Sequence, residues 1–419
     1  MQLREADEKY LRWVFSLMAV IYFFTMLHPL TNNLIFLKLS YAAMFVVSIG
    51  CLPFFLSNSG RNRLVVVLIF YLVVMVVIGL FRQNWSSYIF FDLKNFFFLL
   101  ILFIPFNKRT LVYLLNRLPN LMAGLLLIGL PVSWYFILAM GLQPAGVGER
   151  LSADLDSVKF DFVYSYKFVD FSVLLLPFIN VIKGFRKIVV ILSALTFLLV
   201  SFFTLTRGAT FVCVIGFISM FYMMMHSKKS TDGLKILLFV TIMAFLVIQV
   251  YNLNKLNSTY SSLLFRLNDK ENFTTFRADE QSDFFNFSTI DEILLGRGMG
   301  GSHFFGIWSG SMGASLTHGM NMTHFGYLYL ILKGGVILLV IIYGMALHAM
   351  VKLWKYGGTY QAYSIVIILY LFYEISITKF YDPFYLFLLL MAIYVARNLP
   401  GYSSQNKLLL QQNLGQPAA

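Results

Sequence analysis

Long apolar stretches alternate with short polar connections along the whole chain. The stretches are rich in bulky aliphatic and aromatic residues and lack the strict polar alternation of half-buried strands. Only helices and closed barrels satisfy their backbone in lipid, so the pattern predicts an all-α, polytopic membrane protein with about twelve transmembrane helices. The expected spans are residues 12–31, 34–56, 64–81, 89–106, 119–140, 168–182, 187–205, 209–226, 235–252, 324–350, 360–378 and 382–397.

The composition agrees with a lipid environment. The chain is 59% hydrophobic and 12% charged, whereas a soluble domain is usually about 25% charged. The net charge of +13 resides in short basic clusters between the apolar runs, which favours membrane topology signals over a nucleic-acid partner. Cys51 and Cys213 both lie inside apolar segments, so we expect them to pack there and form neither a disulfide framework nor a metal site.

The basic clusters predict the orientation of the spans. They fall on alternate connections, and the positive-inside rule assigns these connections, with both chain ends, to the cytoplasm. The clusters are Arg61 and Arg63, Lys108 and Arg109, Lys183 with Arg186 and Lys187, Lys228 and Lys229, Lys352 and Lys355, and Arg397.

The two longest connections, 141–167 and 253–323, then face the opposite side of the membrane. The longer one carries aliphatic and aromatic residues throughout, which predicts a folded, partly helical cap. We therefore divide the chain into residues 1–252 with the outward loop 141–167, a large periplasmic loop at 253–323, and residues 324–419 with the last spans and a cytoplasmic tail.

Several enzymatic signatures are absent from the sequence. It has no phosphate-binding Walker loop, no HExxH motif and no clustered aspartate pair that would hold a metal and a sugar nucleotide. We expect no metal and no cofactor. An enzyme built on this chain would draw its energy from an already activated donor such as a polyprenyl diphosphate, whose leaving group needs cations, and arginine binds phosphate oxygens in paired contacts.

Arg207 is the first candidate cation. It lies in SFFTLTRGATF, where one apolar run passes into the next through a very short connection. A permanent charge at such a position is either functional or an interfacial anchor that reaches the lipid headgroups.

The 253–323 loop supplies further candidates in Arg266, Arg277 and Arg297. They either form a diphosphate clamp or make ordinary loop ion pairs worth at most about 1 kcal/mol each. Candidate partners for such pairs are Asp269, Glu271, Asp279, Glu280 and Asp283. The glycines around Gly298, in GRGMGG, permit close backbone approach to a ligand or a tight turn without one.

His324 lies where the long loop re-enters the membrane, in MNMTHFGYLYLILKGG. Thr323 is expected to cap the following helix, which would place His324 in its first turn. The positive helix end there favours neutral imidazole, a proton acceptor suited to general-base work. The alternative is a hydrogen-bonded interfacial histidine. Asp92 and Lys94 either form a buried ion pair or lie near the outer end of their span.

Taken together, these segments resemble the O-antigen polymerase and ligase superfamily. The family pattern of Thr-x-[Ser/Thr]-Arg, a loop arginine, a Gly-x-Gly element and a histidine before an aromatic-Leu helix occurs here in order over roughly residues 200–350. The matching residues are Thr204, Thr206, Arg207, Arg277, Gly298 and His324. Many ligases have His-Asn at the re-entry, whereas Phe325 follows His324 here, which favours the polymerase.

The resemblance implies a metal-independent, inverting glycosyltransferase of the membrane-embedded GT-C type in a bacterial inner membrane. It would transfer a glycan from undecaprenyl diphosphate to the sugar hydroxyl of an incoming lipid-linked repeat unit at the periplasmic face. Arg207 and Arg277 or Arg266 would hold the diphosphate, with Arg297 and Gly298 as further substrate contacts, and His324 would activate the acceptor. Its partners would be lipid-linked oligosaccharide repeat units, membrane lipids and a chain-length regulator protein.

Two other functions are consistent with the same residues. A ligase would use the same donor with a lipid A core acceptor. A flippase or exporter of lipid-linked sugars would line a translocation path with the arginines, although such transporters commonly carry charges within spans of both halves, and the first half here has few beyond Asp92 and Lys94.

Overall fold

The computed structural model is helical throughout the part of the chain that it describes. That part comprises residues 3–31, 33–58, 63–103, 111, 113–140, 167–203, 207–226, 281–302, 325–376, 379–380 and 382–399. No strand occurs in these ranges, which confirms the all-α class. The residues form two compact units, one made of Met1–Leu121 and Gln281–Ala419, the other of Met122–Glu280.

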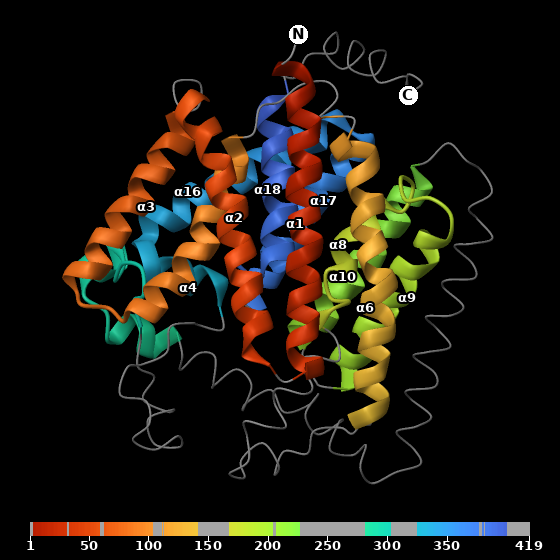
Figure 1. The fold of residues 1–419 in the computed structure, drawn as a ribbon, viewed down its shortest axis with the longest axis horizontal. Helices are drawn as coiled ribbons and strands as arrows, with labels where there is room; N and C mark the ends of the chain where they lie inside the picture. Colours follow the sequence, from red (N-terminus) through yellow and green to blue (C-terminus); the bar gives the residue numbers. More distant parts are fainter. Residues whose placement is uncertain are drawn as a thin grey trace. The chain divides into compact units, whose positions relative to one another are not determined.

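The first unit contains the elements at both ends of the sequence (Figure 1). Its helices are α1 (Leu3–Thr31), α2 (Leu34–Asn58), α3 (Arg63–Phe81), α4 (Ser86–Phe97), α14 (Ile290–Leu295), α16 (Gly326–Tyr356), α17 (Gly358–Ser376) and α18 (Pro383–Asn398). The 3₁₀ helix η2 (Phe98–Phe103) continues α4, and the π-helix η3 (Tyr113–Arg117) leads into α6 (Leu118–Met140).

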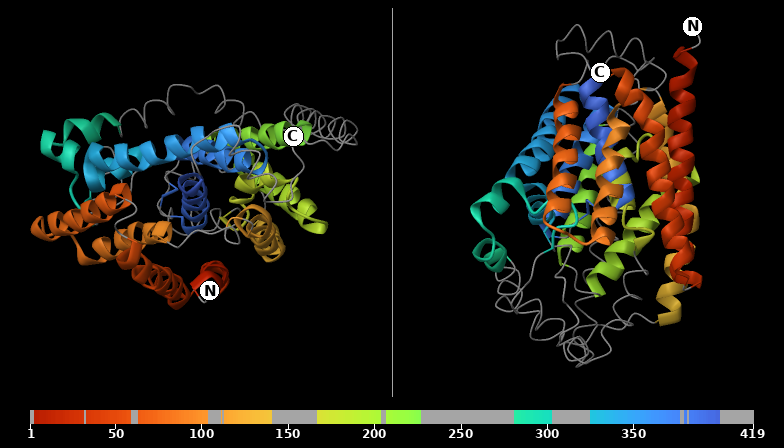
Figure 2. Two further views of the ribbon diagram at one scale, coloured as in Figure 1. Left: turned by 90° about the horizontal axis from the view of Figure 1, so that it is seen from above. Right: turned by 60° about the vertical axis from the view of Figure 1, so that its left-hand side comes forward.

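Helix α18 forms the core of this unit. Its N-terminus is well capped. The N-cap residue Asp382 accepts hydrogen bonds from the backbone N–H groups of Phe384 and Tyr385, and Pro383 occupies the first turn. All residues from Phe384 to Ala396 are buried. Seen from above, α18 lies between α16 and α17 on one side and α1 and α2 on the other (Figure 2). A helix that is apolar all round lies either in the core of a large protein or in a membrane, and here other helices of the unit cover it.

Helix α3 has an apolar face that the protein leaves uncovered. Its exposed residues Val67, Phe70, Val73, Val77 and Leu80 recur every three or four positions, and its buried residues Leu68, Leu72, Met75 and Gly79 form the opposite face. An apolar stripe that the protein leaves uncovered along one helix face is what a lipid-facing surface requires.

The second unit contains most of α6, the short helices α8 (Ser172–Leu175) and η4 (Leu176–Phe178), and the helices α9 (Phe185–Phe203) and α10 (Arg207–Met225). The span expected at residues 168–182 is not one continuous helix. Its middle folds into α8 and η4, with Pro177 in the first turn of η4, because proline has no N–H to extend the preceding helix. Phe168 to Ile179 are nevertheless all buried.

Five described helices are long and apolar enough to cross a membrane, and each overlaps a predicted span. These helices are Arg12–Thr31, Leu34–Pro53, Tyr113–Leu138, Gly208–Met225 and Gly326–Tyr356. The chain is therefore a polytopic helical membrane protein in its described part. The count of about twelve spans, the folded periplasmic cap and the domain division at 252 and 323 stay predictions, because 227–280 and 303–324 lie outside the described residues.

Candidate functional site

The segment Gly296–Gly301, called the glycine turn below, packs inside the first unit. Gly298 and Gly300 adopt φ values of +80° and +75°, where side chains other than glycine are strained. A Cβ on Gly298 would also overlap the backbone of Gly79 in α3. Glycine is thus required for a tight turn against protein, which is the ligand-free alternative that the sequence allows.

An interruption in α16 receives this turn. Gly334 and Gly335 are non-helical, with φ values of −138° and +65°, so the carbonyl groups just before them lose their helical partners. The glycine turn replaces those partners. The N–H of Arg297 donates to the carbonyl oxygen of Leu332 at 2.8 Å, and the N–H of Gly298 donates to the carbonyl oxygen of Lys333 at 3.1 Å. The Tyr71 hydroxyl donates to the carbonyl oxygen of Gly334 at 2.7 Å. A broken membrane helix is stable when other groups take up its freed carbonyls in this way.

Helix α3 and the connection after it hold the other side of the glycine turn. The N–H of Met299 donates to the carbonyl oxygen of Met75 at 2.9 Å. The side-chain amide of Asn84 donates to the carbonyl oxygens of Arg297 and Met299, both at 2.9 Å.

A fully buried ion pair lies beside the glycine turn. The ammonium of Lys333 is 2.9 Å from Oδ2 of Asp92, and neither side chain is exposed (0% each). Asp92 also accepts from the Gly300 N–H and the Tyr329 hydroxyl, both at 2.7 Å. Lys333 donates in addition to the carbonyl oxygen of Gly301 at 2.6 Å. One carboxylate therefore joins α4, α16 and the glycine turn.

The partner of Asp92 is thus Lys333, and the Asp92–Lys94 pair that the sequence allows does not form. Lys94 donates to Oδ1 of Asn95 at 2.9 Å, and its ammonium lies 4.1 Å from the ring centroid of Phe91 and 4.5 Å from that of Tyr41. Aromatic faces stabilise a buried cation in this arrangement.

A second polar cluster joins α14 to the end of α3. Arg82 binds Glu292 at 2.8 Å and Asp291 at 3.1 Å. Arg297 binds Glu292 at 3.0 Å and donates to the carbonyl oxygens of Ser302 (2.7 Å) and Phe287 (3.2 Å). Arg297 therefore makes an intramolecular ion pair, the kind of contact that the alternative interpretation expects, but with Glu292, which is not among the expected partners. Its substrate contact stays a prediction.

Both acids of this cluster have shifted pKa values. A hydrogen bond with the Thr289 side chain, then one from the backbone of Asp291 itself and the charge of Arg82, lower the pKa of Asp291. Burial by itself raises the pKa of Glu292, but the Thr289 N–H and the charges of Arg297 and Arg82 outweigh it, and the net pKa is lowered. Glu292 and Thr289 also form a capping box at the start of α14.

The start of α16 is fixed by α17. The side chain of Glu374 is buried, and it packs against Gly326 so closely that no Cβ fits there. Its Oε1 accepts from the N–H of Lys379 at 2.6 Å. The helix begins at Gly326 with Phe325 at its N-cap. The expectation of a Thr323 cap with His324 in the first turn is therefore wrong, because the chain is still extended at Phe325.

The remaining predicted site residues are placed only in part. Arg207 is the first residue of α10, while its side chain, together with Arg266, Arg277 and His324, lies outside the described residues. Arg297 and Gly298 are brought together in the glycine turn. Among the described residues, no group of His, Cys, Asp and Glu side chains is placed to hold a metal ion.

Sequence reasoning missed the roles of Lys333, Tyr329, Arg82 and Glu374. A signal for the first two exists, because Lys333 and Tyr329 are spaced four residues apart on one face of an apolar helix that a glycine pair then interrupts. No family model, curated protein or solved structure matches the chain. The fold and site thus define a polytopic helical membrane protein in which the glycine turn is hydrogen-bonded to the interrupted helix α16.

Proposed function

We propose that the protein is a membrane-embedded glycan polymerase. In this reaction an acceptor sugar hydroxyl attacks the anomeric carbon of a glycan carried on undecaprenyl diphosphate. The bond from that carbon to the diphosphate oxygen breaks with inversion, the hydroxyl proton passes to His324, and undecaprenyl diphosphate leaves. The proposal rests on the ordered motifs at Arg207, Arg277, Gly298 and His324.

One structural observation carries the proposal furthest: the chain is anchored on both sides of residues 303–324. On one side Lys333 binds the carbonyl oxygen of Gly301, and on the other Gly326 packs against Glu374. His324 is only two residues before that second anchor. A general base must be held within hydrogen-bond reach of its substrate, and an anchored neighbourhood supports this role.

The proposal includes the location and the partners of the enzyme. We place it in a bacterial inner membrane with both termini in the cytoplasm and the site at the periplasmic face, on the strength of the alternating basic clusters. It would act on lipid-linked repeat units together with a chain-length regulator, and it would need no metal. Reporter fusions after Lys229 and near Asn272 test the orientation, and a cytoplasmic reading near Asn272 would contradict it.

Arg207 offers the sharpest test of the site. Guanidinium presents parallel donors to two phosphate oxygens, whereas ammonium is a point charge. If Arg207 binds the diphosphate, Arg207→Lys should therefore lose polymerase activity. Loss of one transition-state contact costs about 3 kcal/mol, or roughly a hundredfold in rate. We expect Arg207→Lys, Arg207→Ala and His324→Ala each to leave single repeat units on a polysaccharide gel at matched membrane abundance.

Arg186 provides a matched control, because it is an exposed arginine at the start of α9. Arg186→Lys should leave the ladder unchanged. A normal ladder from Arg207→Lys would instead make Arg207 a lipid anchor. A ligase is recognised by its product, since it attaches glycan to lipid A core, whereas a polymerase makes lipid-linked polymer without any core.

A transporter of lipid-linked sugars is the second candidate. It is favoured by the interruption of α16 at Gly334 and Gly335 beside the buried Asp92–Lys333 pair, since discontinuous helices and buried charges occur in transport pathways. Purified protein in liposomes distinguishes the two functions. Movement of a fluorescent lipid-linked sugar between leaflets without polymer formation would support the transporter.

A further inference from the structure

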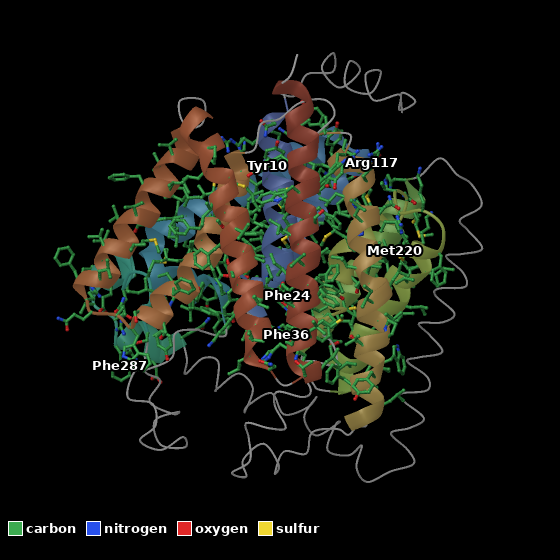
Figure 3. The ribbon with its side chains drawn as sticks, viewed as in Figure 1. Tyr10, Phe24, Phe36, Arg117, Met220 and Phe287 are labelled. Carbon is green, nitrogen blue, oxygen red and sulfur yellow. The ribbon has the colours of Figure 1, made fainter. Side chains whose placement is uncertain are left out.

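Helix α14 and the residues just before it expose an unusually apolar surface. We call Phe285, Phe287, Ile290, Leu294 and Leu295 the α14 surface; their exposed fractions are 44%, 63%, 78%, 50% and 44%. Figure 3 shows Phe287 at the edge of the first unit. In a water-soluble loop such a cluster would be costly, so it marks contact with an apolar partner.

The end of α3 marks where the lipid surface of this unit stops. The exposed stripe of α3 continues through Leu80 to Phe81, which is 84% exposed. Arg82 follows directly, and then Trp85, which is half exposed and lies 5.8 Å from Tyr88 between ring centroids. An arginine together with Trp and Tyr at the end of an apolar span is typical of the membrane–water interface.

Helix α14 is fastened at this same level. Its acidic residues Asp291 and Glu292 bind Arg82, the first residue after α3. Helix α14 is therefore tied to the residue that directly follows the exposed stripe of α3.

The polar groups of α14 are suited to such a position. The charges of its two acids are balanced by Arg82 and Arg297. Its first turn is closed by the capping box of Thr289 and Glu292, and the Gly296 N–H donates to the carbonyl oxygen of Glu292 at its end. Little polar area would be left unpaired when the helix enters the boundary between headgroups and acyl chains.

We propose that α14 is an interfacial helix whose exposed surface rests among the acyl chains at the edge of the bilayer. The partner is hydrocarbon and not an anionic headgroup, because the basic side chains of this cluster are already paired with acids. The contact would hold the glycine turn, which follows directly at Gly296, at a fixed depth. This inference is independent of the proposed catalytic activity.

Site-directed spin labelling of the full chain in phosphatidylcholine nanodiscs tests the proposal. A nitroxide is attached at Ile290→Cys and, separately, at Leu294→Cys; the native Cys51 and Cys213 are buried, and unmodified protein serves as the blank. Relaxation by oxygen, which partitions into lipid, is compared with relaxation by a water-soluble nickel chelate. Phe70→Cys provides a lipid reference and the exposed Lys355→Cys an aqueous one.

Both α14 labels should be relaxed more by oxygen than by the nickel chelate, as at Phe70, and equally with and without phosphatidylglycerol. A Lys355-like response at both positions would overturn the proposal by showing that α14 faces water. Protection from both reagents would overturn it in favour of a protein cover, either a second copy or another segment of the chain. A requirement for phosphatidylglycerol would contradict the hydrocarbon assignment.

Discussion

The buried Asp92–Lys333 pair should behave as one energetic unit. Lys333→Met keeps most of the side-chain volume but removes the ammonium, so the Asp92 carboxylate, at 0% exposure, keeps the Gly300 N–H and the Tyr329 hydroxyl as donors but loses its opposite charge. Breaking a buried pair by removing one partner costs about 3–5 kcal/mol. Asp92→Asn should cost a similar amount, because the Lys333 ammonium would then lose its opposite charge while it stays fully buried.

Removing both charges together should be less harmful than removing either one. In the double variant Asp92→Asn with Lys333→Met, no buried charge is left without its partner. We therefore expect it to be more stable than either single variant, which requires a coupling energy in the double-mutant cycle larger than the cost of either single variant, that is, above about 3–5 kcal/mol.

Unfolding of the purified protein in mixed micelles of increasing sodium dodecyl sulfate content, followed by tryptophan fluorescence, measures these differences. Lys355→Met is the matched control, because Lys355 is an exposed lysine on the same helix α16, and it should change stability by no more than about 0.5 kcal/mol. Additive costs of the two single variants, or a double variant less stable than both, would refute the reasoning.

Three further predictions concern the surroundings of this pair. Gly335→Ala should be strongly destabilising, because φ is +65° and a Cβ would overlap a neighbouring backbone carbonyl, whereas Gly344→Ala, with open space around it, should be tolerated; thermal melting of the two variants compares them. The lowered pKa of Glu292 stabilises the fold above the pKa of the unfolded carboxyl, about 4.3, and that contribution disappears as pH falls through the lower folded value. Melting temperatures measured from about pH 6 to about pH 3 should therefore fall more steeply for the native chain than for Glu292→Gln, and equal slopes would contradict the assignment. Tyr71→Phe should cost about 1 kcal/mol by leaving the Gly334 carbonyl without this donor, and an unchanged unfolding midpoint would count against that bond.

The sequence determined the class of the protein and much of its helical layout. Continuous apolar runs near span length are sufficient for this, because lipid permits few backbone conformations and each helix satisfies its own hydrogen bonds. The predicted starts at residues 34, 64 and 382 lie within one residue of α2, α3 and α18. The stretch 168–182 fails as a continuous helix for an equally local reason, the proline within it.

The contacts between distant segments were decided only by the tertiary structure. Asp92 and Lys94 are neighbours in sequence, yet Asp92 binds Lys333, because burial brings α4 against the interrupted part of α16. The glycines of GRGMGG favour a tight turn over a ligand loop, but only the structure shows its partners, the carbonyl groups of α16 that the helix interruption frees. The spacing of residues along the chain predicts local conformation. Which ion pair a buried charge forms depends instead on which groups folding buries next to one another.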